Sequence, residues 1–82
     1  MSPNDKIFKR SYAPELLRIA QEDFKTAAFL ATSADIRKEN ILFHLEQSVE
    51  KALKAVLCSK GIEVPLTHDL YAIVQRFADR GL

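Results

Sequence analysis

The stretch of sequence that decides the fold is ILFHLEQSVEKALKAV, residues 41–56. Its apolar residues recur every three or four positions, which is the spacing of one broad face of an α-helix. These residues are Ile41, Leu42, Leu45, Val49, Ala52, Leu53 and Val56. On the other side we place Glu46, Glu50 and Lys54, the last two in the favourable i, i+4 order of an ion pair. The pattern predicts a long helix over residues 36–60.

The same spacing predicts two further helices, one on either side of this segment. The first covers residues 12–32, with Pro14 in its first turn, where the missing N–H costs nothing. The third covers residues 68–80. Their apolar stripes are Leu17, Ala20, Phe24, Ala27 and Ala31 in the first helix, and Leu70, Ile73, Val74 and Phe77 in the third. We expect three helices and no strand.

Turn-forming residues separate the predicted helices. Ser33 or Asp35 is expected to cap the second helix, since short polar side chains compete with helical backbone bonds. Gly61 is expected to end that helix in the left-handed conformation that glycine tolerates. Val64 precedes a proline and should be extended, and Thr67 is expected to cap the third helix.

A chain of 82 residues is long enough for one domain. We interpret residues 1–11 as an N-terminal arm and residues 12–82 as a helical domain. The fold class is all-α, an antiparallel bundle of three main helices. Because the third helix is short, the wide face of the second helix would stay exposed, so we expect dimerisation to complete the bundle. The predicted core or dimer face consists of Leu45, Val49, Ala52, Leu53 and Val56.

The composition excludes several classes of function. Lys and Arg number 12 against 11 Asp and Glu, and this net charge of +1 excludes a dedicated polybasic nucleic-acid module, though not a local basic patch. Cys58 is the only cysteine, so the sequence holds no disulfide framework and no cysteine-based zinc motif, and we expect its thiol to be buried. Tyr12 and Tyr71 lie too far from any basic cluster to predict a base-stacking platform.

The sequence shows neither a membrane segment nor a cofactor motif. No run approaches the roughly 18 apolar residues of a membrane helix, and the first residues lack the apolar core of a signal peptide. There is no glycine-rich phosphate loop, and the two histidines lack metal-ligand spacing. We therefore expect a cytoplasmic protein without a cofactor, a metal site or a membrane contact.

Two separate motifs resemble the HEPN domain family. The segment FHLEQSVEKALKA, residues 43–55, is similar to the family's second-helix signature of an aromatic-His start, a Gln, and then Glu-Lys-x-x-Lys-Ala. Thr67-His68-Asp69-Leu70 resembles the Thr-His-Asp-Leu that opens the family's next helix. The resemblance covers about residues 12–78. The first helix matches more loosely, through Ala20, Asp23, Phe24 and Ala27.

This resemblance implies a helical bundle, usually dimeric, whose members bind nucleotides or RNA. Many members are ribonuclease toxins or pair with a minimal nucleotidyltransferase. The nuclease members carry an Arg, four to six residues, and then a His on a later helix, whereas no histidine follows His68 here. Arg37 and His44 formally fit that spacing. They lie at the start of the second helix, where the family's pair does not sit, so we treat this match as coincidence.

Two functions follow from these observations. The first is a non-catalytic HEPN-like module that dimerises and binds a nucleotide or RNA phosphate, or that docks a nucleotidyltransferase partner in a toxin–antitoxin type of pair. The alternative is a metal-independent HEPN ribonuclease toxin, or a truncated remnant of one. The missing Arg–His pair favours the first function.

Five residues are candidates for binding a phosphate. His44, Ser48 and Lys51 fall on one helical strip beside the apolar face, where an imidazole and an ammonium could meet a phosphate. Lys54, further along the same helix, and His68, at the start of the third helix, could add to that strip. The simpler interpretation, which we prefer, is a histidine at the core edge, a solvated lysine, and a third helix capped by Thr67 and Asp69.

Overall fold

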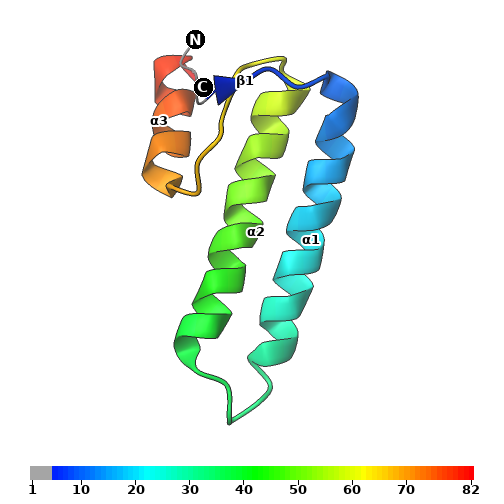
Figure 1. Ribbon diagram of the computed structural model, residues 1–82, viewed down its shortest axis with the longest axis vertical. Coiled ribbons are helices and arrows are strands. Elements are labelled where there is room, and N and C mark those ends of the chain that lie inside the picture. The colour runs from blue at the N-terminus through cyan, green and yellow to red at the C-terminus, as the bar shows by residue number, and fades with distance from the viewer. Residues whose placement is uncertain (1–4) are drawn as a thin grey trace.

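The computed structural model describes residues 5–82. Two long helices, α1 (Ala13–Leu30) and α2 (Lys38–Ser59), run antiparallel as a hairpin, and a shorter helix, α3 (Leu70–Asp79), follows. The third helix packs against α2 rather than α1 (Figure 1). The predicted all-α architecture is confirmed, and each helix is one or two residues shorter at each end than expected.

Small side chains allow α1 and α2 to lie close together. Ala20 and Ala27 are buried, as is Leu16 one turn before Ala20. The hydroxyl of Ser48 on α2 donates a hydrogen bond of 2.9 Å to the backbone carbonyl of Ala20 on α1. Because a side chain can reach a backbone carbonyl only over a short distance, this bond marks a close approach of the two helices.

The start of α2 differs from the prediction. Its N-cap is Arg37, whose side chain makes no capping hydrogen bond. The Ser33 hydroxyl instead accepts a bond of 3.4 Å from the backbone N–H of Asp35, inside the loop. The expectation that Ser33 or Asp35 caps α2 is therefore wrong, because the loop closes on itself before the helix begins.

Glycines end α2 and α3 in the same way. Gly61 has a φ of 69°, its N–H donates to the carbonyl of Cys58, and the N–H of Ile62 donates to the carbonyl of Leu57. This pair of bonds is the Schellman motif, which requires a left-handed residue after the helix. Gly81 has the same φ at the end of α3. The prediction that Gly61 stops the second helix is confirmed.

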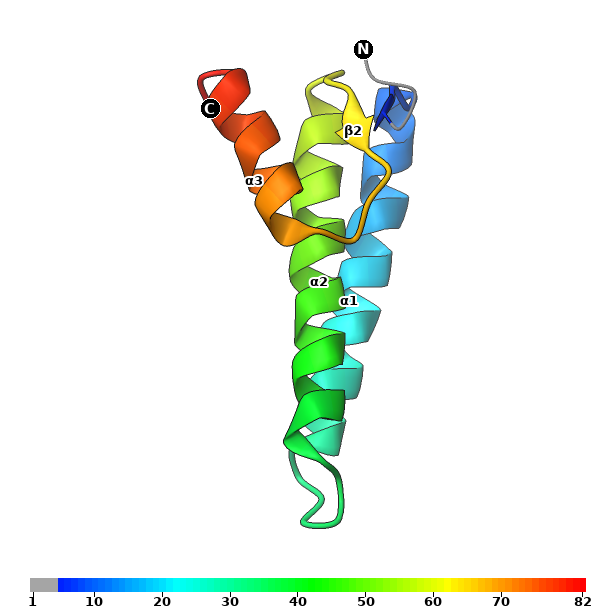
Figure 2. The same ribbon diagram turned by 60° about the vertical axis from the view of Figure 1, so that its left-hand side comes forward.

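A small strand pair joins the N-terminal arm to the link between α2 and α3, residues 60–69. The strand β1 (Asp5–Lys6) pairs antiparallel with β2 (Val64–Pro65), with Lys6 opposite Val64 (Figure 2). Val64 is extended, as its place before a proline predicts, and its backbone is free to pair with the arm. The expectation of no strand is therefore wrong here. A 3-10 turn, η1 (Arg10–Tyr12), leads from the arm into α1.

The hydrophobic core lies at the end of the hairpin where the link and α3 meet α2. Its buried members are Leu16, Ala55, Leu57, Cys58, Val64 and Ile73. The thiol of Cys58 donates to the carbonyl of Lys9 at 3.2 Å, and burial raises its pKa. The prediction of a buried thiol is confirmed. None of the helices within residues 5–82 has the length and apolar character needed to cross a bilayer.

The predicted core or dimer face of α2 is only partly covered. Leu53 packs against the core, and Leu45 and Ala52 are half-buried. Val49 and Val56 remain 49% and 41% exposed. The reason is that α3 and its link cover a different face of α2, so part of the apolar face stays open. Dimerisation through this face stays a prediction.

Candidate functional site

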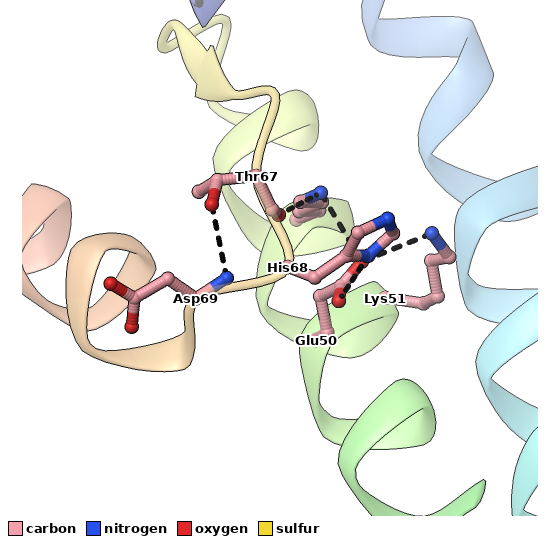
Figure 3. A network of polar contacts seen from close by, with 6 residues as sticks. Glu50, Lys51, Thr67, His68 and Asp69 are labelled. Atoms are coloured by element: carbon pink, nitrogen blue, oxygen red, sulfur yellow. Dashed lines mark hydrogen bonds and ion pairs between the residues drawn. The ribbon is translucent and has the colours of Figure 1, made fainter. Parts of the chain in front are cut away.

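A buried polar cluster surrounds Glu50, in the middle of α2. Its side chain is only 1% exposed, and three basic side chains contact its carboxylate (Figure 3). The Nζ atoms of Lys51 and Lys54 lie 3.1 and 3.2 Å from Oε2. Nδ1 of His68 lies 2.9 Å from Oε1. Since a charged carboxylate only accepts hydrogen bonds, this ring nitrogen carries a proton.

The location of Glu50 contradicts the sequence-based expectation. Helical periodicity placed Glu50 and Lys54 on the solvent side of the second helix, yet both are buried. The reason is that the link and α3 return over this charged face of α2. The cost of burying a carboxylate and an ammonium is offset here because the two groups pair and accept or donate further bonds.

Lys54 ties the cluster to the link before α3. Its Nζ donates to the backbone carbonyl of Thr67 at 2.8 Å, in addition to its contact with Glu50. His68, the next residue, reaches the same carboxylate while its side chain stays 75% exposed. Two adjacent residues of the link are thus held by a single buried ion pair on α2. The cluster therefore positions the start of α3.

The Thr-His-Asp segment also builds the cap of α3. Asp69 is the N-cap, and its Oδ1 accepts a bond of 3.0 Å from the backbone N–H of Tyr71. The hydroxyl of Thr67 accepts a bond of 3.1 Å from the N–H of Asp69 (Figure 3). The expectation that Asp69 helps to cap α3 is confirmed, whereas the expectation that Thr67 caps it is wrong, because the Thr67 hydroxyl is used in the preceding turn.

The charge of the cluster is set by its contacts. Burial alone raises the pKa of Glu50, but the hydrogen bonds from His68 and Lys51, together with the Lys54 ammonium, outweigh it and hold the pKa below its ordinary value. The carboxylate is therefore charged at neutral pH. Two lysines then face one carboxylate, which leaves one positive charge. Of the two, Lys51 is the one partly open to solvent, with 23% of its side chain exposed.

The structure places the five candidate phosphate ligands in three different surroundings. Lys51, Lys54 and His68 gather around the buried carboxylate. Ser48 is engaged with α1. The buried Nδ1 atom of His44 has no hydrogen-bond partner among the described residues, and its ring packs edge-on against a phenylalanine with centroids 5.4 Å apart. The predicted strip is therefore not one continuous surface.

Sequence reasoning missed Glu50 as the centre of the site. The signal was present in part, since Glu50 and Lys54 were recognised as an i, i+4 pair and His68 as part of a separate motif. Helical periodicity does not predict the path of the link, and it is this path that brings the two motifs together. Within residues 5–82, no group of three or more His, Cys, Asp or Glu side chains is arranged to hold a metal ion.

A second group of side chains lies on the arm, just before α1. The rings of Phe8 and Tyr12 stack with centroids 5.4 Å apart, and Nζ of Lys6 lies 5.0 Å from the centroid of Phe8. Lys9 lines the same surface hollow. The expectation that Tyr12 is remote from any basic cluster is therefore wrong. The η1 turn, closed by a bond from the N–H of Tyr12 to the carbonyl of Lys9, brings these groups together.

The fold and the Glu50 cluster define a class of protein. Its members have a long helical hairpin and a shorter third helix. A Glu-Lys-x-x-Lys motif on the second helix contacts a Thr-His-Asp-Leu motif at the start of the third. A family model of the HEPN domain matches residues 13–82, and the chain belongs to the HEPN domain family. The resemblance noted from the sequence is confirmed. This family covers nucleotide- and RNA-related roles. No curated protein and no solved structure matches the chain.

Proposed function

We propose that this HEPN chain is a non-catalytic interaction module that pairs with a second copy of itself through the apolar face shared by α1 and α2. The observation that carries the proposal is the amount of apolar surface left open on that face. Phe24 on α1 is 56% exposed and Val49 on α2 is 49% exposed, with Leu17 and Val56 beside them. Exposed apolar side chains that are contiguous in this way are typical of interfaces.

The shape of this face supports a helical partner. Two adjoining hollows run between α1 and α2 and share Leu17 and Ala52. The remaining lining residues are Ala20, Gln21, Phe24, Lys25 and Ser48 in one hollow, and Ala13, Pro14, Ala55, Val56 and Ser59 in the other. Small residues at the centre leave room for side chains of a packed helix. We call this surface the α1–α2 groove.

The charge of the groove favours a second copy over a charged partner. Lys25 is the only charged residue that lines the two hollows. A face that is nearly uncharged offers nothing to a strongly acidic or basic partner, but it is complementary to itself, as a two-fold interface requires. A nucleotidyltransferase of the toxin–antitoxin type is the competing partner for this groove. Charge substitutions on the groove distinguish that partner from a second copy of the chain.

Phosphate binding at the Glu50 cluster is a second candidate function. Two lysines face one carboxylate there, and Lys51 and His68 are open to solvent. The cluster does not line the α1–α2 groove, so the two candidate surfaces are separate. Against this function stands the fact that all three basic groups already contact Glu50. A nucleotide or RNA phosphate would have to compete with a buried carboxylate for them.

The ribonuclease alternative has one specific test. Arg37 and His44 are the pair with the required spacing, although Arg37 is the N-cap of α2, His44 lies early in that helix, and Nδ1 of His44 is buried. We expect the purified chain to leave RNA intact. Metal-free cleavage that disappears in His44→Ala, with the fold retained, would support the nuclease function instead.

The proposal is tested by a matched pair of charge substitutions. Val49→Asp places a charge on the apolar stripe of α2 that also carries Ala52 and Val56 of the groove, whereas Val74→Asp places the same charge on α3, where the valine is similarly exposed at 54%. Because both side chains are exposed, neither change should unfold the chain. An unpaired charge in an apolar interface commonly costs several kcal/mol, so sedimentation velocity at micromolar concentration should show a monomer for Val49→Asp and a dimer for Val74→Asp.

Two results would contradict the self-association proposal. Equal effects of the two substitutions would show that the groove is not the interface. A wild-type monomer that co-purifies from its host with a nucleotidyltransferase, and loses it on Val49→Asp, would assign the groove to that partner.

A further inference from the structure

We infer that the N-terminal arm forms a binding site for single-stranded nucleic acid, with one base stacked on Tyr12 and the flanking phosphates held by Lys6 and Lys9. This site lies outside the α1–α2 groove and does not depend on self-association. It also lies outside residues 13–82, which match the HEPN family model.

The aromatic rings of the arm form a stack that the fold holds in place. Phe8 is half-buried and packs against the core, so its position is fixed by the fold. One partner of its ring is Tyr12, stacked with an interplanar angle of 19°, and another is the ammonium of Lys6. Tyr12 is itself 40% exposed. Phe8 therefore acts as a support that holds the Tyr12 ring in place at the surface, where a base can stack on it.

Two lysines lie near these rings. Lys6, Lys9 and Tyr12 line one hollow, together with Ile7, Phe8 and Ser11. Among the described side chains, no carboxylate forms an ion pair with Lys6 or Lys9. Glu63, the acidic residue just before β2, is already held by Arg76 and Arg80. Both lysines therefore line the hollow as positive charges that an anionic ligand can pair with.

Backbone hydrogen bonds hold the hollow in place at both ends. Lys6 is in β1, which pairs with β2. Tyr12 ends the η1 turn, which is closed by its bond to the carbonyl of Lys9. Arg10, inside the turn, donates to the carbonyl of Lys60 at 3.4 Å and so links the turn to the end of α2. A site whose groups are already ordered loses less entropy when a ligand binds.

A single strand fits this combination better than other anions. The two lysines alone would bind any polyanion. The exposed ring of Tyr12, supported by Phe8, adds a flat apolar surface on which a nucleobase can stack. The bases of a single strand are free to stack, whereas those of a duplex are already stacked on each other.

The test uses the fluorescence of Tyr12 in the full chain. The sequence contains two tyrosines and no tryptophan, so in the Tyr71→Phe variant all of the tyrosine emission comes from Tyr12. Titration with a ten-residue oligouridylate at low salt should quench this emission, because a stacked base contacts the ring. An oligomer of the same length without bases should bind more weakly and leave the emission unchanged.

Matched substitutions then separate stacking from charge. Tyr12→Leu should weaken oligouridylate binding roughly tenfold, as expected when one stacked base is lost, while Tyr71→Leu on α3 should have no effect. Lys6→Gln with Lys9→Gln should lower the salt dependence of the affinity by about 0.7 in the log–log slope for each phosphate contact removed. Lys38→Gln, on an exposed lysine at the start of α2, is the charge control.

Three outcomes would overturn the inference. One is unquenched Tyr12 emission while the oligomer binds, which would put the ligand elsewhere. Another is equal binding by Tyr12→Leu and Tyr71→Leu. The last is binding to phosphatidylserine vesicles without binding to the oligomer, which would make the arm a membrane-surface contact instead.

Discussion

Glu50 shows how a single buried side chain organises this protein. Its carboxylate accepts bonds from Lys51, Lys54 and His68, and Lys54 in turn holds the backbone of Thr67. Removal of one partner from a buried ion pair leaves an uncompensated charge, which is more costly than the absence of the whole pair. The two sequence motifs that mark the family, residues 43–55 and 67–70, therefore contact each other through Glu50 and Lys54.

Loss of the Glu50 carboxylate should destabilise the fold strongly. Glu50→Ala leaves the Lys54 ammonium buried without its counterion, and we expect the free energy of unfolding to fall by about 3 kcal/mol. Glu46→Ala, at an exposed position one turn earlier on the same helix, should change it by less than about 0.5 kcal/mol. Urea unfolding followed by circular dichroism measures both. Equal losses would show that the cluster contributes no more than a surface carboxylate.

A second carboxylate, Glu63, should make stability depend on pH. Hydrogen bonds from Arg80 and the nearby charge of Arg76 lower its pKa from 4.5 to about 2. A group whose pKa is lowered in the folded state stabilises the fold above its unfolded pKa and loses that contribution as pH falls toward the folded value. Stability should therefore be constant from neutral pH down to about pH 5 and then fall between pH 4.5 and 2.

The control for this pH dependence is a pair of neutral variants. Glu63→Gln should flatten the fall between pH 4.5 and 2 compared with the wild type. Glu46→Gln should leave the profile unchanged. Denaturant midpoints measured across that pH range give the comparison, and an unchanged profile for Glu63→Gln would contradict the assignment. Glu50 contributes in the same direction, since its pKa is also lowered.

The end of α2 shows what a helix boundary requires. Gly61 has a positive φ, and a Cβ added there would lie 2.8 Å from Nε of Arg10. Gly81 has the same φ, but a Cβ there would meet nothing within 4 Å. Both glycines complete a Schellman motif, but only Gly61 lies between two packed elements, α2 and the link that carries β2.

Substitution of these two glycines should therefore have unequal effects. Gly61→Ala forces a side chain into the left-handed region and displaces Arg10, so we expect a loss of about 1–2 kcal/mol in the free energy of unfolding. Gly81→Ala carries the same backbone strain at the last turn of α3, where the helix end can fray, and should cost less than half as much. Thermal unfolding of the two variants under one buffer condition checks the ranking.

The helices could be predicted from the sequence, but the covering of their faces could not. Apolar spacing located all three helices, because a period near 3.6 is a local property of the chain. It could not show that the link after Gly61 returns over Glu50 and Lys54 and leaves Val49 and Val56 open. That choice depends on the paths of segments distant in sequence, as does the pairing of β1 with β2.

The candidate site shows the same limit. His44, Ser48 and Lys51 share a helical strip by spacing, yet Ser48 faces a carbonyl of α1 and Lys51 faces Glu50. Spacing along one helix gives the direction of a side chain but not the element that it meets. The stacking of Tyr12 on Phe8 was missed for a related reason, since it depends on a turn in a segment without periodicity.

The hairpin as a whole is covered on one side only. The third helix and the link cover one face of α2, while the α1–α2 groove presents Leu17, Phe24 and Val56 to solvent, and Val49 is exposed on the same stripe of α2 as Val56. A chain of this size buries only roughly 60% of the surface of its unfolded form, so its stability is small. Burial of the groove against a second copy would add apolar contact where the single chain lacks it.

The most direct test of this account is the molar mass of the wild-type chain in solution, measured by light scattering over a dilution series from high to low micromolar concentration. The account predicts a mass near twice 9.3 kDa at the upper end, with dissociation only on dilution. A folded chain that stays at 9.3 kDa at every concentration would contradict it.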